Sequence, residues 1–383
     1  MRSIGSRPDE PGAVQIAITG IGVSTAFGRG DSPLLDGLAS GQPAFRPAAR
    51  FDTSGCRTTM TAGLPGDPKL GVELAAVIEQ ACQRAELSAA DRTEADFLLA
   101  LHTDHDAARD PAATDVIGAV PAEISAATGL AYPARIYTTA CVAGSTAAAD
   151  AAAMISTGRT TRAIVAAGFL VDADSFRLFD AGRTLAVDGQ VRPFSSGRKG
   201  MLLGDGLAAV VIESAQAASR RGVEVLALLA GWGRAGDAFH VVQPHPAGTG
   251  LARAIAAALD RGKVAPAEVG YINANGSGTT FADASEAAAI HRAFEVAADS
   301  VSVSSTKSLH GHALEASSLV ELVVTVLALR AGLLPVNAGF LAADPACQLD
   351  LVLGASRQAK PRYALSLNAA FGGASTALLV ATA

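Results

Sequence analysis

The chain has 383 residues, half of them hydrophobic and only 17% charged, and its formal net charge is −6. This composition is typical of a globular enzyme with a large core and argues against a disordered or fibrous protein. A negative net charge provides no basic surface for nucleic acid, so we expect no nucleic-acid partner. The length suits two domains or two fused halves.

The four cysteines are far apart in the sequence and include no CxxC pair. This spacing fits neither a zinc site nor a disulfide framework, so we expect a reducing, cytoplasmic environment. They are Cys56, Cys82, Cys141 and Cys347.

The two segments that could direct the chain to a membrane do not fit that role. Residues 1–13 are polar and lack the apolar run of an export signal, so we predict a flexible tail. The most apolar helical segment, residues 317–329, is too short to cross a bilayer and contains Glu321. We therefore expect no membrane association.

Short β-branched runs alternate along the chain with Ala-rich segments of helical periodicity. The runs that predict strands are 14–23, 97–101, 162–170, 207–214, 223–231, 269–275, 363–371 and 376–382. The segments that predict helices are 70–86, 142–157, 248–262, 281–294 and 313–331. Because the strands lack polar alternation, we expect them to be buried on both faces of a layered α/β fold. The pattern fits a pseudo-repeated five-layered architecture, divided near residue 216, and also a Rossmann-like sheet.

Cys141 directly precedes a run of small helix-forming residues in the segment TTACVAGSTAAADAAA. A thiol at a helix N-terminus meets the positive end of the helix dipole and unpaired backbone N–H groups. These favour a thiolate and can also stabilise an oxyanion, so Cys141 is a candidate nucleophile. A buried structural cysteine is the alternative.

The segment STKSLHGHALEASSLVEL places Lys307, His310 and His312 in a tight turn before a long apolar helix that holds Glu315 and Glu321. A lysine and a histidine beside a helix start can supply a proton-transfer group and a donor for developing negative charge. For His310 we favour a solvated position at the helix cap.

The turn NGSGTTFADASE begins with Asn275, where an acid or base would be expected. It lacks the Gly-Lys-Ser/Thr ending of a nucleotide-binding loop and any GxGxxG spacing, so we expect no ATP or NAD site here. Its glycines allow the backbone to turn sharply.

Three further groups of polar residues have weaker functional interpretations. The segment LHTDHD could supply metal ligands, but no comparable cluster elsewhere completes a site, so we expect no metal. Two loop histidines suit a structural or lining role, and three basic residues suit a solvated or subunit-contact face. The residues are His102, Asp104, His105 and Asp106, then His240 and His245, then Arg192, Arg198 and Lys199.

Four motifs together resemble the β-ketoacyl-acyl-carrier-protein synthases, the condensing enzymes of the thiolase superfamily. They are TTACVAGST around Cys141, NGSGTTFADASE, KSLHGH with Lys307 and His312, and AAFGG at 369–373. The resemblance extends from about residue 14 to the C-terminus. It implies a thiolase-like fold of five αβαβα layers, with pseudo-repeated halves at 14–215 and 216–383.

The resemblance also implies a role for each matched residue. Cys141 matches the acyl-accepting nucleophile, His312 one of two active-site histidines, and Lys307 the lysine five positions before that histidine. The supporting positions are the acids Glu321 and Asp283, the phosphopantetheine-binding hydroxyls Ser277 and Thr279, and the gating aromatic Phe371.

The chain differs from the family pattern at the first catalytic histidine, where it has Asn275. It also has Ala369 and Ala370 where a Phe-Gly pair is usual, and the segment between residues 97–101 and Cys141 is shorter than in the family. The motifs therefore indicate the family more firmly than they indicate the reaction.

Three functions follow from the resemblance. The first is a condensing enzyme of fatty-acid or polyketide biosynthesis, which acylates Cys141 from an acyl carrier protein and extends the acyl group with a malonyl-type unit. The second is a non-elongating acyltransferase, and the third is the structural subunit of a heterodimer, which the presence of Cys141 argues against. We expect a homodimer, or a heterodimer with another ketosynthase, and no cofactor beyond the phosphopantetheine of the carrier.

Overall fold

The structure is a computed structural model that describes residues 14–102 and 119–383. Its main feature is a 12-stranded mixed sheet, accompanied by two small two-stranded sheets. The main-sheet strands are β1 (Ile16–Thr25), β2 (Gly28–Arg29), β5 (Asp96–Leu101), β6 (Arg135–Tyr137), β7 (Arg162–Phe169), β8 (Gly206–Ser214), β9 (Ala227–Gly236), β10 (Val269–Asn273), β11 (Ser302–Ser304), β13 (Asp350–Leu351), β15 (Tyr363–Ala369) and β16 (Ala374–Ala381). The small sheets pair β3 (Arg46–Pro47) with β4 (Met60–Thr61), and β12 (Leu333–Leu334) with β14 (Arg357–Gln358).

The helices fall mainly between the strands of the main sheet. The α-helices are α1 (Asp31–Ser40), α2 (Leu70–Arg84), α3 (Ala89–Glu94), α5 (Val120–Thr128), α6 (Ala143–Ser156), α7 (Ala173–Ala181), α8 (Ala215–Arg221), α9 (Thr249–Gly262), α10 (Thr280–Phe294), α11 (Lys307–His310) and α12 (Leu314–Ala331). Short 3-10 turns are η1 (Ala140–Val142), η2 (Pro266–Glu268), η3 (Glu295–Asp299) and η4 (Phe371–Gly373).

The main sheet consists of two halves with the same strand pattern. In the first half, β1–β8 and β8–β7 are antiparallel, while β7–β5 and β5–β6 are parallel. In the second half, β9–β16 and β16–β15 are antiparallel, while β15–β10 and β10–β11 are parallel. An antiparallel contact between β1 and β9 joins the halves. The predicted pseudo-repeat is confirmed.

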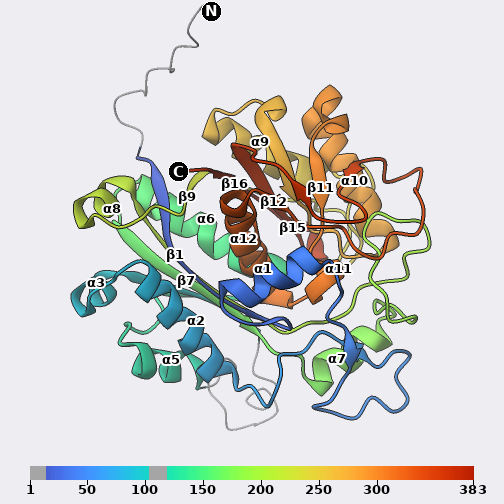
Figure 1. The fold of residues 1–383 in the computed structure, drawn as a ribbon, viewed down its shortest axis with the longest axis horizontal. Helices are drawn as coiled ribbons and strands as arrows, with labels where there is room; N and C mark the ends of the chain where they lie inside the picture. Colours follow the sequence, from blue (N-terminus) through green and yellow to red (C-terminus); the bar gives the residue numbers. More distant parts are fainter. Residues whose placement is uncertain (1–13, 103–118) are drawn as a thin grey trace, which may run out of the picture.

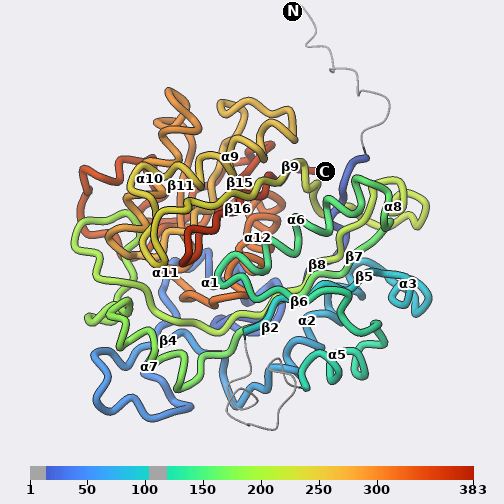
Figure 2. Tube along the Cα trace, turned by 180° about the vertical axis from the view of Figure 1, so that it is seen from behind, coloured from blue at the N-terminus to red at the C-terminus, as the bar shows by residue number. Residues whose placement is uncertain are grey.

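The helices form three layers around these two half-sheets. Helices α6 and α12 lie in the centre and contact strands of both halves, whereas α2 covers β1, β7 and β8, and α9 covers β9 and β16. Figures 1 and 2 show α6 and α12 between α2, α3 and α5 on one side and α9 and α10 on the other. The five-layered αβαβα fold is therefore confirmed, and the Rossmann-like alternative is wrong. The boundary between residues 215 and 216 falls at the start of α8 and stays a prediction.

Burial explains why the central layer is so apolar. All residues from 314 to 329 of α12 are buried, as expected for a helix with neighbours on every side. The strands β1, β7 and β8 are buried along their whole length. This matches the absence of polar alternation in their sequences.

Each half contains a Gly-x-Gly pair where an outer helix approaches the sheet closely. A Cβ at Gly22 of β1 would lie 2.0 Å from a carbonyl oxygen of α2, and one at Gly233 of β9 would lie 1.9 Å from a carbonyl oxygen of α9. Gly20 and Gly231 have equivalent contacts at 2.1 Å. No larger residue fits these positions, so the two pairs are a sequence signature of the repeat.

The predicted elements agree with the structure to within a few residues, with one larger shift. The run at 223–231 was expected to be a strand, whereas β9 begins at Ala227 and continues to Gly236. No helix in the described segments is long and apolar enough to cross a membrane.

Candidate active site

Cys141 lies in the turn η1, immediately before the central helix α6. Its preceding residue, Ala140, has φ of 50°, a left-handed conformation that is strained for a residue with a side chain. The turn contacts α12, β15 and β16. Cys141 is 8% exposed, so its thiol lies at the junction of the two halves and nearly out of solvent.

The surroundings of Cys141 disfavour a resting thiolate. Burial raises the pKa of the thiol to about 12, the Glu315 carboxylate adds to that effect, and the charge of Lys307 opposes it. The expectation that the helix start would yield a thiolate is therefore wrong, because desolvation dominates. The thiol is therefore protonated at neutral pH.

His312 is positioned as a neutral hydrogen-bond donor. Its Nδ1 accepts the backbone N–H of Leu314 at 3.0 Å and lies 3.2 Å from the Ser317 hydroxyl. Because Nδ1 acts as an acceptor, the ring proton is on Nε2. Burial lowers the pKa of His312 well below its ordinary value, and the charge of Lys307 lowers it further. The ring is therefore neutral and offers Nε2–H.

Lys307 connects Asn275 to an acidic residue of α12. Lys307 is 1% exposed and forms an ion pair with Glu321, whose other carboxylate oxygen accepts a hydrogen bond from Asn368. Its Nζ donates to the Asn275 backbone carbonyl at 2.8 Å and to the side-chain Oδ1 at 3.2 Å. Because Oδ1 faces this cation, the other end of the amide is free to act as a donor.

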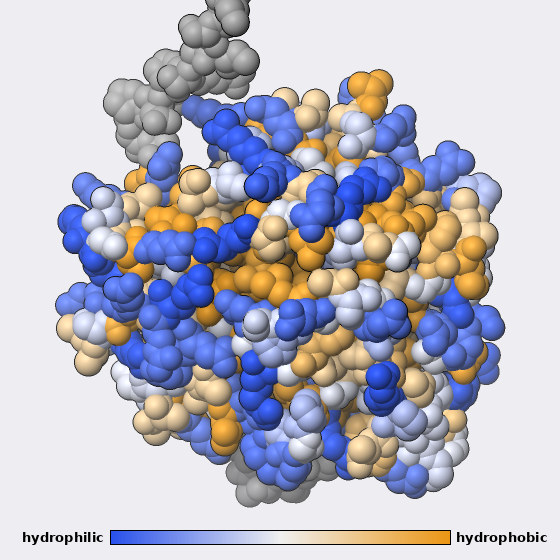
Figure 3. Space-filling model, in the orientation of Figure 1, coloured by the Kyte–Doolittle hydropathy of each residue, from blue (hydrophilic) through white to orange (hydrophobic). Residues whose placement is uncertain are grey.

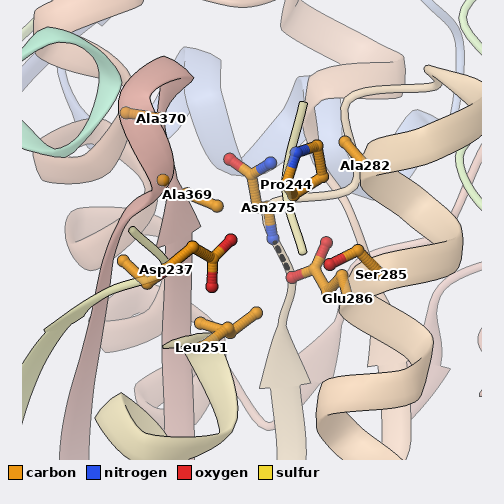
Figure 4. Close-up of a pocket in the computed structure, with 11 residues that line it drawn as sticks. Asp237, Pro244, Leu251, Asn275, Ala282, Ser285, Glu286, Ala369 and Ala370 are labelled. Carbon is orange, nitrogen blue, oxygen red and sulfur yellow. Dashed lines mark hydrogen bonds between the residues drawn. The ribbon is translucent and has the colours of Figure 1, made fainter. Parts of the chain in front are cut away.

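Two buried acids hold the turn that carries Asn275. Glu286 accepts the backbone N–H groups of Asn275 and Gly276 at 2.8 and 2.7 Å, and Figure 4 shows the first of these bonds. Asp283, one turn earlier on α10, accepts the N–H of Gly278 at 3.1 Å. Burial raises the pKa of Glu286 to about 8 and that of Asp283 to about 6. Sequence reasoning missed Glu286, although its spacing of three from Asp283 places both on one helix face.

A small pocket opens beside Asn275. Ala369 and Ala370 lie on the opposite side of it from Asn275 and Glu286, and the Asp237 carboxylate points into the space between the two sides (Figure 4). Cys141 and His312 are not part of its lining, so the pocket lies on the Asn275 side of the site. The other lining residues are Pro244, Leu251, Ala282, Ser285, Glu286, Gly373 and Ser375.

Comparisons with known proteins identify the family. The N-terminal domain of the β-ketoacyl synthases matches residues 71–218, and the C-terminal domain matches residues 226–341. Nodulation protein E of Rhizobium meliloti is 38% identical over 264 residues, which cover 68% of this chain and 64% of that protein.

The chain belongs to the β-ketoacyl synthase family.

Further members of the β-ketoacyl synthase family agree in sequence and in fold. The 3-oxoacyl-[acyl-carrier-protein] synthase 2 of Staphylococcus aureus is 32% identical over 263 residues, 67% of this chain and 65% of that protein. The chain thus aligns with somewhat less than two thirds of the length of these two curated relatives. The solved structure of the ishigamide ketosynthase/chain length factor superposes with a TM-score of 0.87 at 28% identity, over 97% of this chain and all of that one.

The remaining residues matched to the β-ketoacyl synthase motifs are Ser277, Thr279 and Phe371. The hydroxyls of Ser277 and Thr279 are 3.1 Å apart at the start of α10. Phe371 in η4 is 44% exposed, and its ring stacks on Phe179 of α7 with centroids 6.2 Å apart. Their assigned roles stay predictions.

Two expectations about charged residues are wrong. His310 is 1% exposed and its ring contacts the Thr306 hydroxyl at 3.0 Å, so it is a core residue and not a solvated cap. Burial and then the charge of Lys307 lower the pKa of His310 to about 4. Arg198 is also buried, and it pairs with Asp283 and Asp344 instead of facing solvent. Arg198 therefore stabilises Asp283, one of the two acids that bind the turn around Asn275.

The histidine cluster of LHTDHD is described only in part. Asp104, His105 and Asp106 lie outside the described residues, whereas His102 contacts Glu315 through Nδ1 at 2.9 Å. Within 14–102 and 119–383, no group of three or more His, Cys, Asp or Glu side chains is arranged to hold a metal ion.

The two loop histidines stabilise local backbone. His240 Nδ1 accepts the N–H groups of Val242 and Gln243 at 3.0 Å, and His245 Nδ1 accepts that of Ala247 at 3.1 Å. These contacts agree with the structural interpretation of both residues.

Proposed function

We propose that this chain is a condensing enzyme that acylates Cys141 from an acyl carrier protein and extends the acyl group with a malonyl-type unit. The observation that carries the proposal is the buried arrangement of a thiol, a neutral imidazole and an amide fixed by Lys307. A nucleophile and two uncharged donors are what this chemistry requires.

In the first step, Cys141 Sγ attacks the thioester carbonyl of the acyl carrier. The new Sγ–C bond forms as the bond to the pantetheine sulfur breaks, and the thiol proton passes to the departing pantetheine thiolate. Backbone N–H groups beside Cys141 are proposed to hold the transient oxyanion. The hydroxyls of Ser277 and Thr279 are proposed to bind the pantetheine arm.

In the second step, a malonyl thioester replaces the first carrier. His312 Nε2–H and the Asn275 amide donate hydrogen bonds to its carbonyl oxygen. As the bond to CO2 breaks, its electron pair forms an enolate that these donors stabilise. The enolate carbon then attacks the acyl carbon on Cys141, a C–C bond forms, the bond to Sγ breaks, and the departing Cys141 thiolate takes up a proton from solvent.

Non-elongating acyl transfer is the second candidate, and Asn275 is the observation that favours it. An amide donates a hydrogen bond but carries no charge and neither gives up nor accepts a proton near neutral pH. The first step does not depend on this residue, whereas the second does.

The partners follow from the proposed reaction. We propose an acyl carrier protein as the donor and acceptor, and a homodimer as the working assembly. The similarity to a ketosynthase/chain length factor favours a heterodimer as the alternative assembly. We expect no metal or redox cofactor.

The test is intact mass spectrometry of the enzyme and the carrier after incubation with acyl carrier and then malonyl carrier. The proposal predicts an acyl adduct on the enzyme and, after malonyl carrier is added, a carrier-bound chain longer by one two-carbon unit. If the acyl group returns from the enzyme to the carrier at its original length, the protein is a non-elongating acyltransferase instead. If no adduct forms, both the condensing and the transferase functions are excluded.

A further inference from the structure

Glu315 is a buried carboxylate close to the nucleophile that the proposed steps do not use. It lies in the first turn of α12 and is 5% exposed. Its Oε1 contacts His102 Nδ1 at 2.9 Å, whereas its Oε2 is buried and has no hydrogen-bond partner in the structure as described. An unpartnered buried carboxylate oxygen is costly, so it calls for a functional explanation.

The helix face of Glu315 places it beside the Cys141 turn. Glu315, Ser318 and Leu319 are related by three and four positions and therefore share one face of α12. Ser318 Oγ accepts the backbone N–H of Ser145 at 2.9 Å, and a Cβ at Gly144 would lie 2.8 Å from the Leu319 side chain.

This face of α12 therefore packs against the first turn of α6. The turn η1, with Cys141, immediately precedes α6 and contacts α12. Glu315 is one helical turn before Ser318, so it lies on the face of α12 that packs against this region. Among the charged groups that act on Cys141, the Glu315 carboxylate has the strongest influence.

The other groups near Cys141 are poor proton acceptors. His312 Nδ1 already accepts the Leu314 N–H, and Nε2 carries the ring proton. Lys307 is an ammonium ion held by Glu321, and Asn275 is a neutral amide. Because the buried thiol is protonated, some group has to receive its proton when it attacks a thioester.

We propose that Glu315 is the general base that takes the thiol proton of Cys141, with His102 holding the opposite carboxylate oxygen. As Sγ bonds to the acyl carbon, the S–H proton moves to Glu315 Oε2. When the bond to the pantetheine sulfur breaks, the proton passes from Oε2 to the leaving thiolate, and Glu315 returns to its starting state. This step rests on the proposed acylation of Cys141.

Two other roles of Glu315 make opposite predictions. If the carboxylate acts on Cys141 only through its charge, its removal lowers the pKa of the thiol and makes Cys141 more reactive. If the pair with His102 only attaches the end of β5 to α12, its removal lowers stability and leaves the pH dependence of the thiol unchanged.

The first experiment measures alkylation of Cys141 by iodoacetamide, which requires no carrier protein. A Cys56→Ala background removes the one cysteine that is not buried. We expect Glu315→Gln to slow alkylation at neutral pH at least tenfold, since general bases contribute about a hundredfold to ten-thousandfold. Glu73→Gln is the matched control, because Glu73 is also a buried, ion-paired residue in the first turn of a helix. It should leave the rate unchanged.

Equal or faster alkylation in Glu315→Gln would overturn the proposal. Should that variant fail to fold, the parent protein still decides the question through its pH profile. A carboxylate base predicts a rate that changes little with pH around neutrality, whereas an unassisted thiol predicts a rise of about tenfold per pH unit.

The second experiment measures acyl transfer from an acyl carrier to Cys141 in the same variants. A matching loss in Glu315→Gln supports the role in the proposed reaction. If the alkylation result holds but the parent protein accepts no acyl group, the proposed function fails and the proton transfer stands.

Discussion

Asn275 and Cys141 are the two residues on which the proposed reaction depends most. Lys307 interacts with both residues. Its Nζ binds the side chain and the carbonyl of Asn275, and its charge acts on the Cys141 thiol. Replacement of either residue therefore separates the two half-reactions.

Replacement of Cys141 tests the nucleophile. Cys141→Ala should abolish the acyl adduct, because the other cysteines lie outside the junction of α6 and α12. Peptide mapping by mass spectrometry locates any adduct, and Cys82→Ala, which also removes a buried thiol, should acylate normally. Acylation that persists at Cys56 or Cys347 in the Cys141→Ala protein would disprove the assignment.

Replacement of Asn275 tests the second donor. Asn275→His should raise the rate of malonyl decarboxylation and leave acylation of Cys141 unchanged. Loss of an oxyanion donor costs about a hundredfold to a thousandfold in rate, and an amide is a weaker donor rather than an absent one. We therefore expect an increase below a hundredfold, measured as CO2 release. An unchanged rate would show that Asn275 takes no part in the step.

Glu286 gives the turn around Asn275 a pH-dependent stability. The raised pKa means that the folded protein keeps a proton on Glu286 which the unfolded chain releases. The contribution of Glu286 is therefore complete below its ordinary pKa and is lost as the pH rises toward about 8. The side chain at position 286 of Glu286→Gln does not titrate. The free energy of unfolding of this variant should therefore increase relative to that of the parent protein from about pH 5 to about pH 8. Denaturant titrations that show parallel pH profiles would contradict this.

At the scale of elements, the contact between α6 and α12 positions Cys141, the proposed nucleophile. Gly144 permits this contact, because a Cβ there would lie 2.8 Å from the Leu319 side chain and 3.0 Å from its backbone nitrogen. Neither neighbour can move easily in a layer that is buried on all sides.

Substitution of Gly144 tests this positioning. Gly144→Ala should lower the free energy of unfolding by about 1 to 3 kcal/mol, as overpacking does, and should slow acylation of Cys141. Gly236→Ala is the control, since a Cβ there has no atom within 4 Å. Thermal melts and adduct formation measure the two effects. If the Gly144→Ala protein is as stable and as active as the Gly236→Ala control, then α6 and α12 shift enough to accommodate the added methyl group, which would contradict this prediction.

The sequence predicted the elements well, because their periodicity and burial agree. The apolar run of α12 and the uniform strands β7 and β8 follow directly from full burial. The partners of charged residues could not be predicted, since they depend on contacts across the fold. The ion pair of Lys307 and Glu321 connects two different helices, α11 and α12. The contact of His102 with Glu315 connects segments that are far apart in the chain. The protonated state of Cys141 likewise follows from tertiary burial, which local sequence does not reveal.

At the scale of the whole molecule, the exposed surface and the sheet edge favour association. Strand β6 ends the main sheet, and none of the described strands pairs with its outer side. Figure 3 shows hydrophobic residues in a band across the middle of one face. Unpaired edge strands and apolar surface are both typical of subunit contacts.

Light scattering tests the assembly. We expect a particle of about twice the 38.5 kDa chain mass at micromolar concentration. Hydrogen exchange should find the amides of β6 protected in the dimer. A monomer with freely exchanging β6 amides would instead indicate an obligate partner of different sequence.

The most direct test of the account is a single turnover of enzyme already acylated on Cys141 and then mixed with malonyl carrier. Mass spectrometry follows the enzyme adduct and the carrier-bound chain while CO2 is measured in parallel. The account predicts that loss of the Cys141 adduct, release of CO2 and lengthening of the carrier-bound chain by two carbons occur together and in equal amounts. Loss of the adduct without CO2, with the acyl group returned to a carrier at its original length, would contradict it.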